Sequence, residues 1–373
     1  MADNSELYLG LISGTSADGI DAALVRFEDE QPSLVAGLTH PWPDDLRARI
    51  LAIAQDEQRL DLDTYGRLDV AIGRLFAEAA LAVLAQAGVA ASNVRALGSH
   101  GQTIRHRPAG EHPFTLQIGD ASVIAESTRI ETVADFRRAD IAAGGQGAPL
   151  VPAFHAHVLA PTAEPRVVLN LGGIANVSIL GVDGSVTGFD TGPANGLMDA
   201  WCQRQLGEPY DRDGHFAASG RVDERLLAAL LADAYFALPP PKSTGREHFH
   251  LVWLDGHREL SGLAPADVQA TLLALSAITV AHDIARYGHG ARQVVACGGG
   301  VHNAALMEAI RSRLGPVELQ RSSAYGIDPD FMEAMAFAWL ARQRILGRPG
   351  NLPAVTGASG HRVLGAVYLA PTA

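Results

Sequence analysis

A short stretch near the amino terminus combines the residue types that bind a phosphate and a divalent cation. From Gly14 to Asp21 the chain reads Gly-Thr-Ser-Ala-Asp-Gly-Ile-Asp, which supplies two hydroxyls, two glycines and two carboxylates. Backbone N–H groups of a glycine turn bind anions, and carboxylate oxygens bind Mg²⁺. An isolated surface β-hairpin is the alternative interpretation, because Asp18-Gly19 is also a typical tight-turn pair.

Two more glycine turns follow later in the chain. Residues 166–179 read as strand, glycine turn at Gly172-Gly173, and strand, with Asn176 in the second strand. At Gly298-Gly299-Gly300 a buried strand enters a run of glycines that lets a flat group such as adenosine approach the backbone closely. Three such turns favour two similar lobes closing over a nucleotide, and they make phosphate binding the better interpretation of the first turn.

Two carboxylates are candidates for catalysis. Asp190 follows an apolar strand on a glycine-rich turn before a predicted helix, where a fixed turn can hold a general base. An Asx turn or a helix cap explains Asp190 equally well. Glu333 lies three residues after Asp330, which is the spacing of a structural capping box. A catalytic part for Glu333 additionally requires that helix start to face the cleft.

Polar and basic side chains on three predicted loops are candidates for holding a substrate. His100 and Gln102 follow a strand, where open α/β sheets place ligands, although they could equally satisfy turn backbone. Arg137, which has aspartates on both sides, could bind a carboxylate or phosphate bidentately or form a local ion pair. Lys242 and Arg246 share a loop that suits an anionic ligand or is simply a solvated basic loop.

The elements expected around these residues alternate between strands and helices. Apolar runs predict strands at residues 7–12, 22–27, 94–97, 114–118 and 131–135, and beside the two later glycine turns. Helical spacing predicts helices within residues 43–90, ending at Gly88, and over residues 268–287. Asn303 is expected to cap a further helix. The fold class is therefore α/β.

Composition excludes several classes of protein. A hydrophobic content of 47% with 19% charged residues describes a folded chain, and a net charge of −12 argues against nucleic-acid or anionic-membrane partners. Cys202 and Cys297 allow neither a disulfide scaffold nor a C-x-x-C metal site. Lys242 is the only lysine, so no Walker P-loop is present. The start of the chain lacks a signal peptide, and residues 141–163 are broken by Gly and Pro, which predicts a cytoplasmic protein without a membrane span.

At 373 residues the chain exceeds what one hydrophobic core usually supports, so two lobes are expected. We place the boundary near residue 135, where alternating strands give way to Gly and Pro. Lobe I, residues 1–135, carries the first phosphate hairpin. Lobe II, residues 136–373, carries the second hairpin, Asp190 and the late glycine run, and residues from about 350 onward are candidates to return to lobe I.

Taken together, these segments resemble the bacterial anhydro-N-acetylmuramic acid kinase family, within the actin- and hexokinase-like phosphotransferases. The matching segments occur in family order from near residue 10 to the end: SGTSADGID, SHGQTIRHRP, QIGD, ADFR, GGQGAPL, LNLGGIAN, GFDTGPAN, PPKSTGRE, CGGGVHN, EAMAFA, LPAVTGA and VLGAVYLA. One departure is Ala17, where the family typically has Met, a side chain that is not a phosphate ligand by type. The resemblance implies a two-lobed, ribonuclease H-like fold with duplicated mixed sheets, flanking helices and a central ATP cleft.

The resemblance also implies a reaction, in which ATP, water and 1,6-anhydro-N-acetylmuramic acid give N-acetylmuramic acid 6-phosphate and ADP during peptidoglycan recycling. It makes Asp190 the base and places Glu333 near the attacking water. The expected ATP-binding residues are Gly14, Thr15, Ser16, Ala17, Asp18, Gly19, Ile20, Asp21, Gly172, Gly173, Asn176, Gly298, Gly299 and Gly300. Asp18 is the candidate for Mg²⁺, directly or through water. The sequence leaves open whether the protein forms a homodimer.

Two rival functions stay open alongside this one. An ordinary sugar kinase of the same superfamily would phosphorylate a free hydroxyl and leave an anhydro sugar untouched. A nucleotide-dependent binding protein would close on ATP without sugar turnover. In the favoured reaction, capture of O6 by the γ-phosphoryl group replaces the acid that acetal opening normally needs, so only the base is essential.

Overall fold

The computed structural model divides into two compact units. It describes residues 5–14, 17–54, 60–161, 163–245 and 248–372. Unit 1 comprises residues 1–158 and 331–373, and unit 2 comprises residues 159–330. Each unit is built around its own mixed sheet, as the α/β fold class predicts.

The chain leaves unit 1 after Val158 and returns at Phe331. The expected boundary near residue 135 therefore falls inside unit 1, and the returning segment begins before residue 350. Helix α5 (Val151–Val158) packs on helix α12 (Met332–Ile345), so both helices belong to the unit that contains the amino terminus. This packing explains why the composition change near residue 135 does not coincide with the division between the units.

The sheet of unit 1 has the strand order β12-β6-β4-β1-β2-β3, and β5 pairs with β4. Its strands are β1 (Glu6–Ser13), β2 (Ile20–Glu28), β3 (Gln31–His40), β4 (Val94–Arg107), β5 (Phe114–Ile118), β6 (Thr132–Ala134) and β12 (Ala366–Tyr368). β1, β2 and β3 are antiparallel neighbours, whereas β4 runs parallel to β1 and β6 runs parallel to β4.

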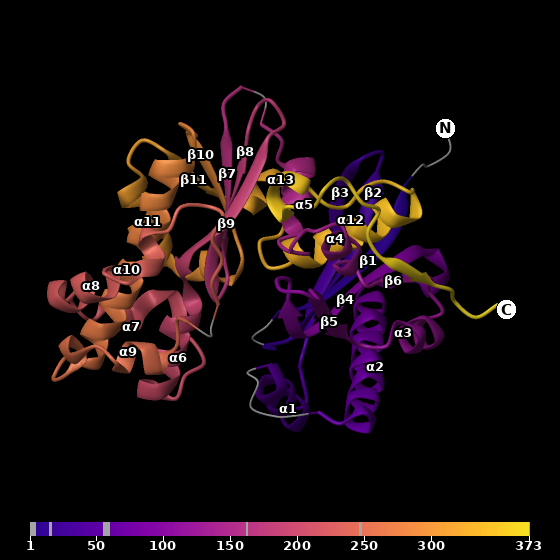
Figure 1. Ribbon diagram of the computed structural model, residues 1–373, viewed down its shortest axis with the longest axis horizontal. Coiled ribbons are helices and arrows are strands. Elements are labelled where there is room, and N and C mark those ends of the chain that lie inside the picture. The colour runs from indigo at the N-terminus through magenta and orange to yellow at the C-terminus, as the bar shows by residue number, and fades with distance from the viewer. Residues whose placement is uncertain (1–4, 15–16, 55–59, 162, 246–247, 373) are drawn as a thin grey trace. The chain divides into compact units, whose positions relative to one another are not determined.

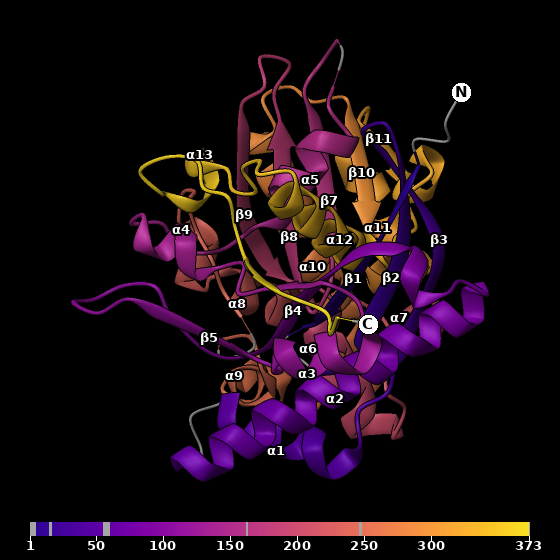
Figure 2. The same ribbon diagram turned by 90° about the vertical axis from the view of Figure 1, so that its right-hand side faces the viewer.

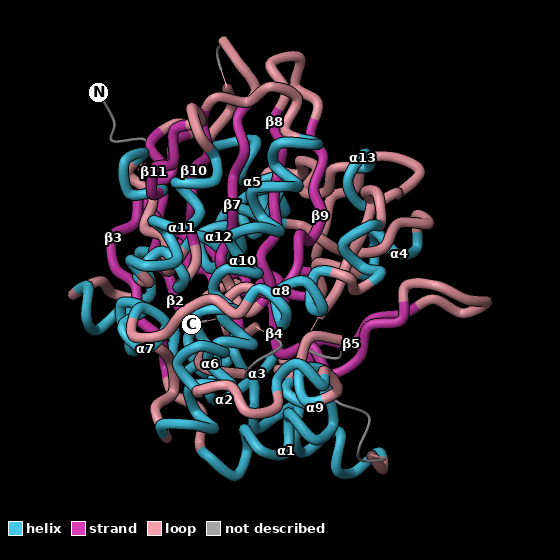
Figure 3. Tube along the Cα trace, turned by 90° about the vertical axis from the view of Figure 1, so that its left-hand side faces the viewer, coloured by secondary structure: helices cyan, strands magenta, loops and turns pink. Residues whose placement is uncertain are grey.

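The sheet of unit 2 repeats this arrangement. Its order is β11-β10-β7-β8-β9, which Figure 3 shows as adjacent strands. The strands are β7 (Arg166–Leu171), β8 (Ile174–Leu180), β9 (Val186–Pro193), β10 (Gln293–Cys297) and β11 (Glu318–Arg321). β7, β8 and β9 are antiparallel, and β10 and β11 run parallel to β7. The same order and directions occur twice, which confirms the predicted duplication and the actin- and hexokinase-like fold class.

Helices cover both faces of the unit 1 sheet (Figure 1, Figure 2). Leu9 and Leu11 of β1 join the core beneath α2 (Leu62–Ala87). Because side chains alternate along a strand, Gly10 faces the other way, toward α12. A Cβ on Gly10 would collide with the α12 backbone at Ala334. The glycine therefore lets this helix lie directly on the sheet. The remaining helices of this unit are α1 (Asp44–Ala54), α3 (Ala121–Thr128), α4 (Arg138–Ala142) and α13 (Pro353–Thr356).

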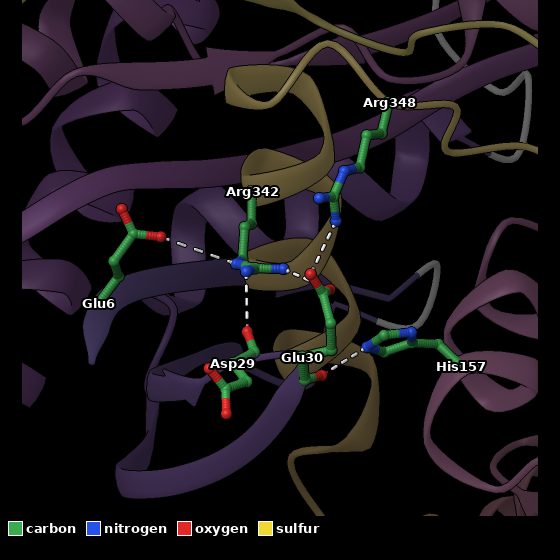
Figure 4. A network of polar contacts seen from close by, with 6 residues as sticks. All are labelled: Glu6, Asp29, Glu30, His157, Arg342 and Arg348. Atoms are coloured by element: carbon green, nitrogen blue, oxygen red, sulfur yellow. Dashed lines mark hydrogen bonds and ion pairs between the residues drawn. The ribbon is translucent and has the colours of Figure 1, made fainter. Parts of the chain in front are cut away.

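A buried arginine ties α12 to the turn between β2 and β3 (Figure 4). Arg342 is 7% exposed, and its guanidinium donates to Glu30 Oε2 and to the Asp29 carbonyl, both at 2.8 Å. Arg348 donates to the other oxygen of Glu30 at 2.8 Å. Hydrogen bonds from both guanidinium groups lower the pKa of Glu30 to about 2, so this network stays charged under ordinary conditions.

In unit 2, helix α10 (Pro265–Tyr287) packs against most of the other helices. The others are α6 (Asn195–Leu206), α7 (His215–Ala218), α8 (Glu224–Leu231), α9 (Leu251–Asp255) and α11 (Ala304–Leu314). α10 is the one helix in the described part of the chain that is long and apolar enough to cross a membrane, and 78% of its most apolar window is buried inside the protein. A buried core helix meets the same criteria, so the length and composition of α10 are weak evidence for a span.

Candidate functional site

The first glycine turn joins β1 to β2 in unit 1. The Ala17 N–H donates to the Gly14 carbonyl at 3.1 Å, and Ala17 adopts a left-handed φ of 49°. A Cβ on Gly19 would collide with the side chain of Thr39, so the turn requires glycine there. Two of the residues expected to bind phosphate, Thr15 and Ser16, lie outside the described residues.

The two carboxylates of this turn have different surroundings. Asp18 is exposed and forms a 2.9 Å ion pair with Arg47 of α1. Asp21 accepts a 2.6 Å hydrogen bond from the Thr39 hydroxyl, and its charge raises the pKa of Glu333. The charge of Asp21 therefore acts on Glu333 within unit 1, whereas the carboxylate of Asp18 is paired with an arginine.

His100 and Gln102 lie in a strand, so the loop predicted for them is wrong. β4 continues from Val94 to Arg107 because it pairs with β1 on one side and with β5 on the other. Both side chains are consequently buried. Gln102 Nε2 donates to the Gly14 carbonyl at 3.2 Å, which joins the β4 residue directly to the first glycine turn.

Arg137 contacts His100 rather than a neighbouring aspartate. Its Nε–H donates to His100 Nε2 at 2.9 Å, and its Nη1 donates to the Gly147 carbonyl at 2.7 Å. The adjacent Arg138 makes the local ion pair with Asp135, at 3.5 Å. Burial lowers the pKa of Arg137 to about 10, against the opposing charge of Glu333, so the guanidinium is protonated at neutral pH.

Glu333 lies in the first turn of α12, where the charges of Asp21 and Arg137 act on its carboxyl group. Burial and then the charge of Asp21 raise its pKa, and the charge of Arg137 opposes them. The predicted capping box is wrong, because Phe331 is the N-cap residue and gives no side-chain hydrogen bond. Asp330 instead binds His302 Nε2 at 2.9 Å within unit 2.

Glycine turns and asparagines meet at one end of the unit 2 sheet. The N–H groups of Asn195 and Gly196 donate to the carbonyls of Gly172 and Gly173, both at 3.0 Å. Gly298 has a φ of 80°, and a Cβ there would collide with the side chain of Asn170. Gly300 is equally confined by Leu171, whereas nothing lies within 4 Å of a Cβ on Gly299. The structure thus brings the second and third glycine turns together.

Asn170, Asn176 and Asp190 form a row across three neighbouring strands. Asn170 of β7 is paired with Asn176 of β8, which is paired with Asp190 of β9. Paired residues of adjacent strands point to the same face of a sheet. Asp190 therefore lies within β9 rather than on the predicted turn, because β9 extends to Pro193. Asn170 was missed from the sequence, although it directly precedes the glycine turn.

Ser243 and Thr244 hold the carboxylate of Asp190. Asp190 Oδ2 accepts hydrogen bonds from the Ser243 hydroxyl and the Thr244 N–H, both at 3.0 Å. Lys242 is buried, unlike a residue of a solvated surface loop. Its Nζ lies 2.7 Å from Asp283 Oδ2 of α10. A direct contact between this lysine and a substrate anion therefore finds no support. Arg246 lies outside the described residues.

The family of the chain follows from its relatives. A family model described as anhydro-N-acetylmuramic acid kinase matches residues 6–370. The protein of that name from Xanthomonas campestris is 58% identical over 368 residues, covering 98% of both chains. The one from Vibrio cholerae is 49% identical over 364 residues, covering 97% of this chain and 98% of the other.

Solved structures show a more distant likeness. Xylulose kinase from Rhodospirillum rubrum has a TM-score of 0.44 and 14% identity, covering 91% of this chain and 90% of the other. Component A of (R)-2-hydroxyglutaryl-CoA dehydratase from Acidaminococcus fermentans has a TM-score of 0.49 and 13% identity, covering 91% and 99%. The match of the family model and the high identity of its relatives carry the assignment: the chain belongs to the anhydro-N-acetylmuramic acid kinase family.

Proposed function

We propose that the protein is an ATP-dependent kinase that opens 1,6-anhydro-N-acetylmuramic acid with water and phosphorylates its O6. The products are N-acetylmuramic acid 6-phosphate and ADP. The observation that carries the proposal is the family match over residues 6–370. The three contacts that residues 242–244 make to Asp190 support its part as a fixed base.

The bond changes in this reaction balance without a separate acid. Water attacks C1 from the face opposite O6, and the carboxylate of Asp190 takes a proton from that water. The C1–O6 bond breaks, O6 forms a bond to the γ-phosphorus, and the bond from the γ-phosphorus to the β–γ bridging oxygen of ATP breaks. A glycosidase would instead protonate the leaving oxygen with a second carboxylic acid.

The glycine turns supply the groups for ATP. Backbone N–H groups from Gly14 to Asp21 and at Gly172-Gly173 suit the phosphates. Gly299, which is exposed and has open space beside it, suits the approach of adenosine within the run Gly298–Gly300. Asn176 is paired with Asp190 on the neighbouring strand, which supports a role for its amide close to the reacting groups.

The carboxylates of unit 1 fit a magnesium ion held largely by water and phosphate. Mg²⁺ commonly binds one or two protein carboxylates in such sites. Asp21, whose carboxylate accepts a hydrogen bond from the neutral Thr39 hydroxyl, fits this requirement better than Asp18, which is paired with Arg47. Among the residues that the structure describes, no group of three or more metal-binding side chains occurs. Bound there, the ion would neutralise charge on the phosphates.

The sugar contacts come from the polar cluster of β4 and Arg137. The guanidinium of Arg137 is a candidate for the anionic lactyl group, because it donates its hydrogen bonds to a neutral ring nitrogen and a carbonyl. His100 and Gln102 belong to the same cluster, and Glu333 would act near the attacking water. The proposed setting is cell-wall recycling in the cytoplasm, with a small-molecule sugar as the partner.

Product analysis tests this function directly. The purified protein should consume ATP with the anhydro sugar present and not without it, and it should not phosphorylate N-acetylmuramic acid at a comparable rate. In ¹⁸O-labelled water the label should appear at C1 of the product and not in its phosphate. Phosphorylation of the free sugar alone would indicate an ordinary kinase, and binding of ATP without turnover would indicate a nucleotide-dependent binding protein.

A further inference from the structure

One short segment of unit 2, residues 242–244, contacts both the side chain and the backbone of Asp190. The hydroxyl of Ser243 and the N–H of Thr244 donate to Asp190 Oδ2 at 3.0 Å. The N–H of Asp190 donates to the Lys242 carbonyl at 3.1 Å. The Tyr235 hydroxyl donates to the Asp190 carbonyl at 2.7 Å. A shift of this segment would therefore move or release the carboxylate.

The segment is anchored by the only lysine of the chain. The side chain of Lys242 is 2% exposed, and its Nζ lies 2.7 Å from Asp283 Oδ2 of α10. The ammonium group also lies 5.1 Å from the ring centre of Tyr235 and 5.9 Å from that of Phe189, the residue before Asp190. These partners connect the core helix α10 to the strand that bears the base.

Stability alone is a weak reason for this arrangement. Removing two charges from water is costly, and apolar residues of similar size often replace a buried ion pair without loss of stability. A buried ion pair does fix geometry, because it allows the side chains few alternative positions. Because Lys242 begins the segment that holds Asp190, a fixed position of Lys242 also fixes that segment.

We propose that Lys242, anchored on Asp283, is a positioning residue that fixes residues 242–244 and through them the carboxylate of Asp190. The inference rests on the proposed function, in which Asp190 accepts the proton of the attacking water. Because Lys242 acts through its neighbours, its loss should lower kcat while leaving the binding of ATP unchanged. It differs in this respect from the direct anion contact expected of a loop lysine.

The direct test replaces both members of the pair. In the double variant Lys242→Met/Asp283→Leu no buried charge is left without a partner. We expect a melting temperature close to that of the wild type, kcat lower by about 10²-fold, and a KM for ATP within about twofold. Wild-type kcat in a folded double variant would overturn the proposal.

A surface variant keeps the proposal testable if the double variant does not fold. Ser243 is exposed, and Ser243→Ala removes only the hydroxyl that binds Asp190; we expect kcat about tenfold lower with unchanged KM for ATP. Ser243→Thr keeps a hydroxyl and should restore most of kcat. Ser185→Ala is the matched control, because the Ser185 hydroxyl donates to the Asp183 carboxylate at 2.6 Å on an exposed turn. Equal kcat for Ser243→Ala and Ser185→Ala would overturn the proposal.

Failure of the inference and failure of the proposed function give different results. If the wild type makes no sugar phosphate from the anhydro sugar, the proposed function is wrong and the positioning role falls with it. If the wild type is active and the Lys242 and Ser243 variants match it, only the positioning role is wrong. Binding of a fluorescent ATP analogue to every variant confirms that each is folded.

Discussion

The Nε–H of Arg137 donates a hydrogen bond to Nε2 of His100 at 2.9 Å, so this arginine is paired with a neutral ring. Nε2 accepts only when it carries no proton, which places the ring proton on Nδ1. Burial, and then the charge of Arg137, lower the pKa of His100 well below its ordinary value. The imidazole therefore does not neutralise the positive charge of Arg137, on which the charges of Glu333 and Asp140 also act.

Arg137→Lys should weaken the use of the sugar more than the use of ATP. A lysine cannot reproduce the planar fork that donates to His100 and Gly147 at once. We expect kcat/KM for the anhydro sugar to fall by about 10–100-fold and KM for ATP to stay within about twofold. Arg138→Lys is the control, since Arg138 forms a 3.5 Å surface ion pair with Asp135. Similar losses in both variants would contradict a specific role for Arg137.

Asp190→Asn should abolish most of the turnover while retaining nucleotide binding. The amide keeps the shape of the side chain but cannot accept the proton of water. A positioned base is worth about 10²–10⁴ in rate, so kcat should fall by that factor. Asp199→Asn, on the helix that follows, should stay within a few-fold of the wild type. Near wild-type turnover of Asp190→Asn would remove Asp190 from the mechanism.

Glu333→Gln should change the pH dependence of stability. Burial and Asp21 raise the pKa of Glu333, so above the ordinary carboxyl pKa the folded state binds more protons than the unfolded state. The free energy of unfolding therefore falls as pH rises through that window. Gln does not ionise, so the melting temperature of Glu333→Gln relative to the wild type should increase from about pH 4 to about pH 8.

The control for this prediction is Glu308→Gln on the surface of α11, where the carboxylate is 69% exposed and pairs with Arg311. Its melting temperature relative to the wild type should be nearly constant over the same range. A flat difference for Glu333→Gln as well would show that Glu333 ionises in the folded protein as it does in the unfolded chain.

Gly98→Ala should destabilise unit 1 because α12 lies directly on β4. A Cβ at this position would collide with the Phe337 carbonyl, and the helix that carries Glu333 would have to move. Overpacking of this kind costs about 1–3 kcal/mol. Gly66→Ala in α2 is the control and should have the opposite effect on stability. A Cβ there meets nothing within 4 Å, and alanine in place of glycine inside a helix stabilises the folded state by about 0.5–1 kcal/mol. Urea unfolding of both variants measures the difference.

Asp140→Asn should loosen three segments at once. Asp140 is fully buried and accepts hydrogen bonds from the Gly147 N–H at 2.8 Å, and from Asn351 Nδ2 and the Thr356 hydroxyl at 2.7 Å. An amide turns one acceptor into a donor, and we expect a loss of about 2–4 kcal/mol in unfolding free energy. Thr356→Val removes only one donor and should cost less. Equal losses would mean that Asp140 is not the centre of this network.

The sequence predicted the local elements well because their signals are local. Gly88 ends α2 in the left-handed conformation, and the side chain of Asn303 caps α11 by accepting from the Leu306 N–H. The strands on both sides of the first glycine turn and the core helix at 265–287 also lie where apolar spacing placed them. Each of these features depends on neighbours a few residues away.

The errors arose where distant partners decide the structure. His100 and Gln102 look like loop residues, but pairing with β1 and β5 extends the strand through them. Judged by its sequence neighbours, Lys242 could be solvated, but it is buried beside Asp283, which lies far along the chain. The β3 strand was missed as well, because its partly exposed residues lack a continuous apolar run. The candidate site depends on such long-range pairings, so its residue types were easier to find than their surroundings.

The burial of Lys242 also determines how the surface reacts with chemical reagents. Since the chain has no other lysine and this side chain is 2% exposed, the folded protein presents almost no ε-amino group to an amine-selective reagent. Positive charge on the described surface comes from arginine and, when protonated, histidine. Acylation of the ε-amine would accordingly report the opening of unit 2 around Asp190, and it would do so at one position in the chain.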